Sequence, residues 1–491
     1  MKDFKSFIKN YSTKEFIRFF STISIEMFKR QRPENNLGYW TTFPLSVVKY
    51  GLIHENVEIK LSAWDIPDMA YLSIINSNDY RREVITEQII GRLVNLYRIY
   101  DDERSKDEHP ENSSLTDIFK MFFGMTYEQF KSQNFEWIYR NFNRNYHILV
   151  GSCDINRNKI IDINEITNEL FGLNVEELLV LEWVIWWLCY HYQTPTPLSV
   201  PEKFYNERVG SIINKKNIEK IIKYYSVSYE DVRKSPLGKQ IFYQKPFVIT
   251  QKKKEMIAVS FYLVYMLLAD GLYWLIRDYY LKKDMGQKFI NAFGEMFESY
   301  FEELAKFYLP KDTWYKIPES NIKSADYYVE MPDNIFLFEL KSVLLGINAK
   351  QQMPDVKTVD IFYQRAIKKA YKQLVSSENE YTGNKPVIKV FLLYETLANS
   401  QMIAASLPEI FENGKKCYIM TIEDLEMLWT TYKNDKIKFG KLIDVLLQNH
   451  EKQKIYTSVC NILNKYQATE EDYFTDERDY YKEIVQKIEI L

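Results

Sequence analysis

Residues 335–345 read Ile-Phe-Leu-Phe-Glu-Leu-Lys-Ser-Val-Leu-Leu, and this stretch decides the fold of the second half of the chain. Its apolar residues occupy both alternating positions, which predicts a strand that is covered on both faces. Glu339 and Lys341 interrupt the run two residues apart, so their side chains point to the same face. Charges in such a strand are costly unless they are paired or bind something. The stretch therefore predicts a functional site on a buried strand.

A third charged residue, Asp326, comes just before another apolar run, and residues 331–334 (Met-Pro-Asp-Asn) are a turn signal between the two runs. A turn centred on residues 332–333 places Asp326 opposite Glu339. A turn centred on residues 333–334 places Asp326 opposite Lys341. Both registers bring the three charged side chains to one face, because side chains alternate with a period of two.

Two carboxylates on rigid strands suit a hard divalent cation such as Mg²⁺ or Mn²⁺. A bound metal lowers the pKa of its water and neutralises charge on a phosphate. A lysine beside it can orient the attacking water and stabilise developing negative charge. This combination predicts phosphodiester hydrolysis. The alternative interpretation is an ordinary buried ion pair with a second carboxylate nearby.

In these residues the chain resembles the PD-(D/E)xK nuclease superfamily, which has the restriction-endonuclease-like fold. By this resemblance Asp326 is the metal-binding aspartate, and Glu339 and Lys341 are the (D/E)xK pair. Residues 294–300 (Gly-Glu-Met-Phe-Glu-Ser-Tyr) are similar to the G-x-x-F-E-x-Y helix that precedes the first core strand in many members. That match makes Glu298 a further catalytic residue and metal ligand. Glu295, one helical turn earlier, is the alternative candidate for the same role. The resemblance covers roughly positions 286–430.

A basic helix is expected after the motif, within residues 360–377. One stripe at helical spacing could contact phosphates without reading sequence; it consists of Arg365, Lys368, Lys369 and Lys372. The alternative for this stripe is a solvated surface face. Members of the superfamily often carry a glutamine or lysine here, and Gln373 is the candidate that the resemblance indicates.

The remaining pattern predicts an α/β nuclease core, a mixed sheet flanked by helices, preceded by a large and mainly α-helical region. Strands are expected at 387–394 and 417–421, with helices at 398–412 and from 422. We therefore expect a helical region at 1–285, the nuclease core at 286–430 and a C-terminal helical extension packed on the core at 431–491. Within the helical region, residues 101–110 are expected to form an acidic surface loop.

Composition narrows the remaining possibilities. The chain has 491 residues and a net charge of −3, so a nucleic-acid surface would have to be local. Its four cysteines and five histidines show no zinc-ligand spacing. Apolar residues 178–190 and 256–276 are expected to be buried core helices and not membrane spans. Residues 154–165 resemble an EF-hand loop, but Lys159 stands where the sharp turn needs glycine, so we do not predict calcium binding.

These observations predict a cytoplasmic, Mg²⁺- or Mn²⁺-dependent endonuclease. DNA is the expected substrate, with RNA as the alternative. By analogy with nucleases that carry long extra regions, we expect an effector of bacterial anti-phage defence. The helical region would then sense a trigger or bind a regulatory protein partner. The rival hypothesis is a catalytically silent scaffold whose nuclease-like core binds nucleic acid or protein.

Overall fold

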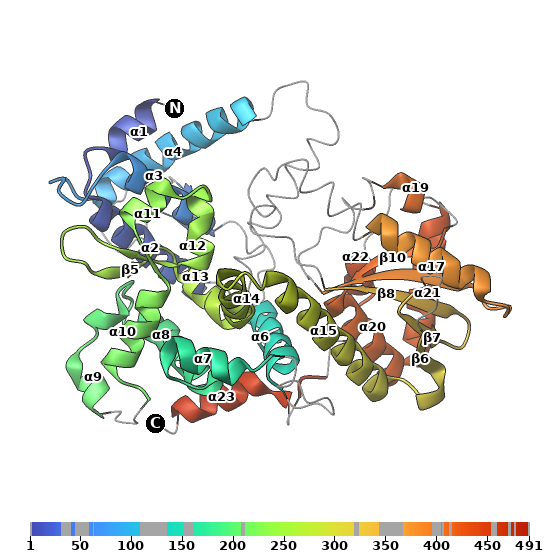
Figure 1. Ribbon diagram of the computed structural model, residues 1–491. Coiled ribbons are helices and arrows are strands. Elements are labelled where there is room, and N and C mark those ends of the chain that lie inside the picture. The colour runs from blue at the N-terminus through green and yellow to red at the C-terminus, as the bar shows by residue number, and fades with distance from the viewer. Residues whose placement is uncertain are drawn as a thin grey trace.

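The computed structural model describes most of the chain and arranges it in two lobes joined along α15 (Gly286–Tyr308) (Figure 1). The helical lobe contains the elements before α15, and the sheet lobe contains most of the elements after it. The described residues are 2–30, 41–44, 58–61, 63–108, 135–151, 161–207, 212–318, 324–342, 367–394, 404, 407–411, 415–452, 459–469, 473–475 and 478–489.

The helical lobe is built around helices that are apolar on most sides. Its helices are α1 (Lys2–Ile8), α2 (Thr13–Arg30), α3 (Asp65–Asn76), α4 (Glu87–Glu108), α6 (Phe135–Leu149), α7 (Ile163–Phe171), α8 (Val175–His191), α9 (Glu202–Glu207), α10 (Lys215–Tyr224), α11 (Tyr229–Lys234), α12 (Ile241–Gln244), α13 (Phe261–Met266) and α14 (Leu272–Lys282). A π-helix, Leu267–Gly271, joins α13 to α14. The buried helix α8 starts at a capping box in which Asn174 and Glu177 satisfy each other's backbone N–H groups.

Short strands also occur in the helical lobe, so the predicted region at 1–285 is mainly but not wholly helical. Strands β1 (Thr41–Pro44) and β2 (Glu58–Leu61) form an antiparallel pair. Strands β3 (Ser226–Ser228), β4 (Phe247–Ile249) and β5 (Met256–Ala258) form a three-stranded sheet. Strand β5 takes up Met256–Ala258, and of residues 256–276 the part from Phe261 forms the expected buried core helices.

The sheet lobe is organised around a mixed five-stranded sheet in the order β10-β9-β8-β7-β6. Its strands are β6 (Trp314–Lys316), β7 (Tyr327–Glu330), β8 (Ile335–Lys341), β9 (Val387–Leu393) and β10 (Cys417–Thr421). Strands β6, β7 and β8 pair antiparallel, whereas β8, β9 and β10 pair parallel. The predicted α/β character of this part is confirmed at the level of a mixed sheet with helices.

Both faces of this sheet are covered, which explains why β8 and β9 are apolar at nearly every position. One face packs on α15 and α20 (Ile422–Asn434), where Phe301 contacts both Phe338 and Trp429. The other face packs on α17 (Lys369–Glu380) and α19 (Pro408–Phe411). Of the helix expected at 398–412, the structure describes only α19 and two further residues, Ala404 and Leu407.

The turn between β7 and β8 takes the first of the two predicted registers. Glu330 pairs with Ile335, and the Met331 amide donates to the Asn334 carbonyl, so residues 332–333 are the centre. Tyr327 pairs with Phe338. Continuing this register by one residue places Asp326 opposite Glu339.

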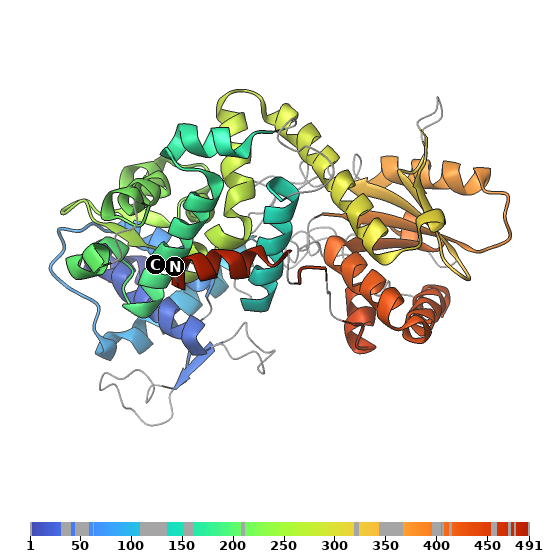
Figure 2. The ribbon, with the colours of Figure 1, turned by 90° about the horizontal axis from the view of Figure 1, so that it is seen from below.

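The C-terminal part does not pack as one extension on the sheet lobe. Helices α21 (Lys436–Lys452) and α22 (Val459–Lys465) contact α20. Helix α23 (Tyr480–Glu489) instead contacts α6 and α8, and Figure 2 shows it running along the helical lobe. The last helix therefore packs on the helical lobe, so the chain crosses from the sheet lobe back to the helical lobe at its C-terminal end.

Buried polar contacts join the lobes at α6. Arg144 is buried and donates to Glu426 of α20, with its Nη2 2.6 Å from Glu426 Oε2. His147 hydrogen-bonds to Glu303 of α15 and to the hydroxyl of Tyr480. Because buried ion pairs tolerate little misalignment, this network fixes α6 against the sheet lobe.

Among the described residues, no helix has both the length and the apolar composition needed to cross a membrane.

One expected loop is helical. Residues 101–108 continue α4, whereas the acidic composition predicted a surface loop. Arg104 explains the difference, because it pairs with buried Asp68 of α3 and with Asp101 one turn earlier. These tertiary contacts stabilise a segment whose composition alone indicates solvent exposure.

Candidate metal and phosphate site

Asp326 sits at the entry to β7, held by the strands on either side. Its amide donates to the Phe338 carbonyl at 2.9 Å, and its own carbonyl accepts from the Ile317 amide at 2.9 Å. Its carboxylate oxygen Oδ2 accepts from the Leu340 amide at 2.7 Å. The side chain is therefore fixed against β8, beside the position of Glu339.

Glu339 and Lys341 form an ion pair on the same face, with Lys341 Nζ 2.6 Å from Glu339 Oε1. The Glu339 side chain is 1% exposed, whereas that of Lys341 is 20% exposed. The second carboxylate oxygen, Oε2 of Glu339, is buried and has no hydrogen-bond partner among the described residues. An unsatisfied buried carboxylate oxygen is costly, so it marks a position where a ligand would be stabilising.

Burial makes the charged form of both carboxyls less favourable than it is in water. Burial raises the pKa of Glu339 to about 7; Lys341 opposes this shift and Asp326 adds to it. Burial also raises the pKa of Asp326, against the Leu340 hydrogen bond and the charge of Lys341. Two neighbouring carboxyls with raised pKa values are typical of functional sites, although structural networks can do the same.

Glu298 lies near this pair but does not join it directly. It is on α15, its charge raises the pKa of both Asp326 and Glu339, and its Oε2 accepts from Lys316 of β6 at 2.6 Å. Glu295, the alternative candidate, is exposed. No group of three or more His, Cys, Asp or Glu side chains with metal-binding geometry occurs in the described part of the chain. The structure thus brings Asp326, Glu339 and Lys341 together and leaves Glu298 at the edge.

The glycine of the G-x-x-F-E-x-Y segment brings α15 close to the end of β8. A Cβ atom at position 294 would lie 3.5 Å from the hydroxyl oxygen of Ser342, the residue that follows Lys341 in the chain. Gly294 and Glu298 are four residues apart and so share a helix face. The close approach places Glu298 at the rim of the site.

Helix α17 supports the segment that leads into Asp326. Gln373 Nε2 donates to the Ser324 carbonyl at 3.1 Å, and the Ala325 amide donates to the Ser377 hydroxyl at 2.9 Å. Gln373 therefore contacts the backbone two residues before Asp326. This is a positioning contact, and the nucleic-acid contact expected of Gln373 stays a prediction.

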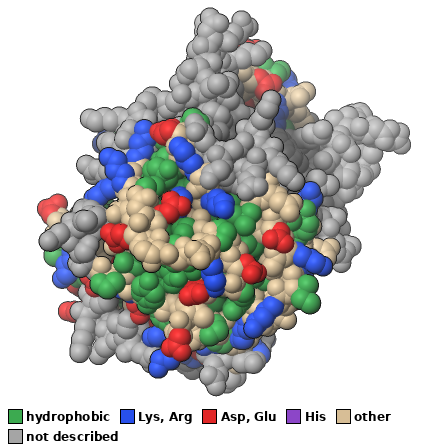
Figure 3. Space-filling view, turned by 90° about the vertical axis from the view of Figure 1, so that its right-hand side faces the viewer, with side chains coloured by type: hydrophobic (Ala, Val, Ile, Leu, Met, Phe, Trp, Pro, Cys, Tyr) green, Lys and Arg blue, Asp and Glu red, His purple; other side chains and the backbone are tan. Residues whose placement is uncertain are grey.

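The predicted basic stripe lies in part on the described surface. Lys368 pairs with Glu409 of α19 at 3.2 Å, and the side chains of Lys369 and Lys372 are solvent-exposed. Arg365 lies outside the described residues. Figure 3 shows basic and acidic side chains interspersed on the outer face of the sheet lobe, with no continuous basic patch in its described part.

Three residues near the site were not singled out from the sequence. Lys316 pairs with Glu298, Glu302 accepts from the Tyr327 hydroxyl at 2.9 Å, and the Tyr394 amide donates to the Lys341 carbonyl at 3.1 Å. Lys316 could have been suspected because it alternates with Trp314 on a short strand before Asp326. The other two depend on packing across the sheet, which sequence spacing does not encode.

Comparison with known proteins does not assign the chain to a family: no family model, curated protein or solved structure matches it.

The EF-hand-like segment offers no second site in the described residues. Its positions 154–160 lie outside them. Asp162 caps α7 by accepting from the Glu165 amide at 2.9 Å. The ion pair on β8, with Asp326 beside it, is therefore the strongest candidate for chemistry.

Proposed function

We propose that the protein is a metal-dependent nuclease that hydrolyses phosphodiester bonds at Asp326, Glu339 and Lys341, with DNA as the preferred substrate. The observation that carries the proposal is the unpartnered oxygen Oε2 of Glu339, buried on the face that also holds Asp326. A carboxylate oxygen in that position fits a divalent cation, which would satisfy the oxygen and offset both negative charges.

Two carboxylates are enough for the cation that the resemblance implies. Mg²⁺ is usually bound through one or two carboxylates and keeps several waters, so it does not need a third protein ligand. Asp326 and Glu339 would hold the ion, and Glu298 would act from outside through its own charge. When bound, Mg²⁺ or Mn²⁺ supplies an acidified water and a counter-charge for the phosphate.

Lys341 would act on the phosphate and the attacking water. Its ammonium has three donor protons, and Glu339 Oε1 accepts one of them. The others can donate to a phosphate oxygen or hold a water in line for attack. Its ion pair with Glu339 fixes its position on a rigid strand, which reduces the reorganisation needed during reaction.

The test is cleavage of plasmid DNA and of single-stranded RNA with Mg²⁺, Mn²⁺ or EDTA. We expect metal-dependent cleavage that Lys341→Met lowers by about 10²–10³-fold, the effect of removing one charge-stabilising donor. Lys385→Met is the matched control. Lys385 also pairs with a glutamate on this sheet, Glu330 at 2.7 Å, but at the opposite end of β7.

Two results would refute the assignment of nuclease activity. One is cleavage that persists in EDTA, and the other is equal activity in the Lys341→Met and Lys385→Met proteins. If neither nucleic acid is cleaved while Mg²⁺ still binds, as measured by calorimetry, the core is a silent scaffold. The proposed defence role has its own test: phage should plate less efficiently on cells expressing the wild type than on cells expressing Lys341→Met.

A further inference from the structure

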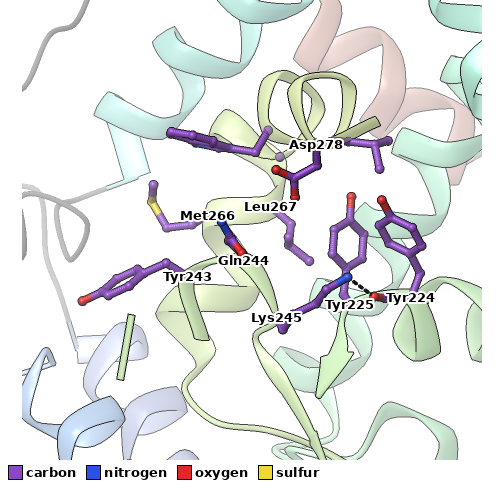
Figure 4. Close-up of a pocket in the computed structure, with 11 residues that line it drawn as sticks. Tyr224, Tyr225, Tyr243, Gln244, Lys245, Met266, Leu267 and Asp278 are labelled. Atoms are coloured by element: carbon purple, nitrogen blue, oxygen red, sulfur yellow. Dashed lines mark hydrogen bonds between the residues drawn. The ribbon is translucent and has the colours of Figure 1, made fainter. Parts of the chain in front are cut away.

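A second candidate site lies in the helical lobe, in a part of the chain that precedes β8. It is a pocket between the end of α10, the segment after α12, the π-helix and α14 (Figure 4). Its cavity volume is about 30 Å³, and the pocket is open to solvent at its mouth. Its principal lining residues are Tyr224, Tyr225, Tyr243, Lys245, Trp274 and Asp278.

The pocket holds a cation and an anion that do not pair with each other. Lys245 Nζ donates to the Tyr224 carbonyl and lies 4.2 Å from the centre of the Tyr224 ring. Asp278 has neither a hydrogen bond nor an ion pair within the described residues. Burial lowers the pKa of Lys245 to about 8 and raises the pKa of Asp278. Both groups therefore have unused hydrogen-bonding capacity in a partly dehydrated hollow.

These groups select the chemistry of a ligand. Asp278 would repel an anion, and Lys245 together with the neighbouring Lys282 would repel a cation, so a neutral molecule fits best. It should offer an acceptor to the lysine and a donor to the aspartate. Four aromatic side chains around the hollow favour a flat ring, because a planar ring can stack on aromatic faces.

We propose that this pocket binds a neutral, planar nitrogen heterocycle of the nucleobase type, and that its occupancy is linked to the site on β8. Lys245 and Asp278 would read the hydrogen-bonding edge of the ring. The π-helix forms one wall of the pocket, and such irregular turns are frequent at functional sites.

The link follows a continuous set of hydrogen bonds. In the π-helix, the Ala269 carbonyl accepts from Asn145 Nδ2 at 2.6 Å. Asn145 of α6 in turn accepts from the Tyr394 hydroxyl, and the Tyr394 amide donates to the Lys341 carbonyl at 3.1 Å. A shift of the π-helix would therefore act on the strand that carries Lys341. This second half of the proposal rests on the proposed function of that strand.

Binding is tested by titrating cytidine, uridine, adenosine and guanosine into the full-length protein in a calorimeter, with ribose as the non-aromatic control. We expect at least one nucleoside to bind and ribose not to bind. Lys245→Met and Asp278→Asn should each weaken binding by about tenfold or more. Lys223→Met is the matched control, since Lys223 is an exposed lysine on α10 that does not line the pocket. Failure of all four nucleosides, or equal affinity in all variants, would overturn the proposal.

The link is tested by hydrogen–deuterium exchange, which does not require nuclease activity. The bound nucleoside should change exchange in the peptide that contains Tyr394, and Tyr394→Phe should remove that change while leaving affinity within about twofold. Tyr394→Phe keeps the ring that packs on Phe293 and Phe297. Binding without any change at Tyr394 would refute the link and retain the pocket. Loss of cleavage alone would count against the nuclease and leave both results standing.

Discussion

Replacing Glu339 by glutamine should stabilise the protein at pH 8 in the absence of metal. The pKa of Glu339 lies at about 7 in the folded chain, against an ordinary value of 4.5. Between these values the folded protein keeps a proton that the unfolded chain has released, so stability falls as the pH rises. At about 1.36 kcal/mol per pKa unit, the full cost is roughly 3 kcal/mol above pH 7, and it is absent below pH 4.5.

Glutamine is neutral at every pH and does not carry this cost. In EDTA we expect Glu339→Gln to melt higher than the wild type at pH 8, with the difference shrinking towards pH 5. Scanning calorimetry measures both. Mg²⁺ should raise the melting temperature of the wild type at pH 8 and not that of the variant. Glu330→Gln, which breaks the half-exposed pair with Lys385, should change stability by less than about 1 kcal/mol.

The opposite sign would refute this reasoning. If the pair of Glu339 and Lys341 merely held the fold together, Glu339→Gln would melt lower than the wild type at pH 8. A difference that does not vary with pH would show that Glu339 does not titrate between these values. Either result would remove the physical reason for a cation at this place.

Three further outcomes are expected. Arg144→Met should cost about 3–5 kcal/mol of stability because it leaves Glu426 buried without its cation, and adding Glu426→Gln should restore part of the melting temperature. Asp326→Asn should keep the fold, since an amide oxygen can still accept from the Leu340 amide, while calorimetry shows Mg²⁺ affinity lower by more than about tenfold. Lys372→Ala should reduce the slope of log affinity against log salt for DNA by about 1, measured by fluorescence anisotropy without metal; an unchanged slope would show that this lysine does not contact phosphate.

The sequence predicted the strand, the turn and the shared face of Asp326, Glu339 and Lys341. This worked because side-chain alternation and turn chemistry are local properties, and because a charge in a doubly apolar strand is conspicuous. The choice between two registers needed the structure, since both turns satisfied the same pattern. The position of Glu298 also needed it, because its pairing with Lys316 depends on how α15 lies across the edge of the sheet.

Long-range packing was not accessible from the sequence. Nothing local indicates that α23 returns to the helical lobe, or that Arg104 and Asp68 keep the end of α4 helical. The pocket was equally hidden, because Lys245 and Asp278 are brought together by the fold and are unremarkable in their own segments. In each case the deciding contacts join residues that are far apart in the chain.

The central claim is that Asp326 and Glu339 hold a divalent cation beside Lys341. The most direct measurement is a crystal grown with Mn²⁺ and examined at the manganese absorption edge. The account predicts an anomalous peak within coordination distance of the Asp326 carboxylate and of Glu339 Oε2. A fully occupied manganese elsewhere, with Glu339 Oε2 still unpartnered, would contradict it.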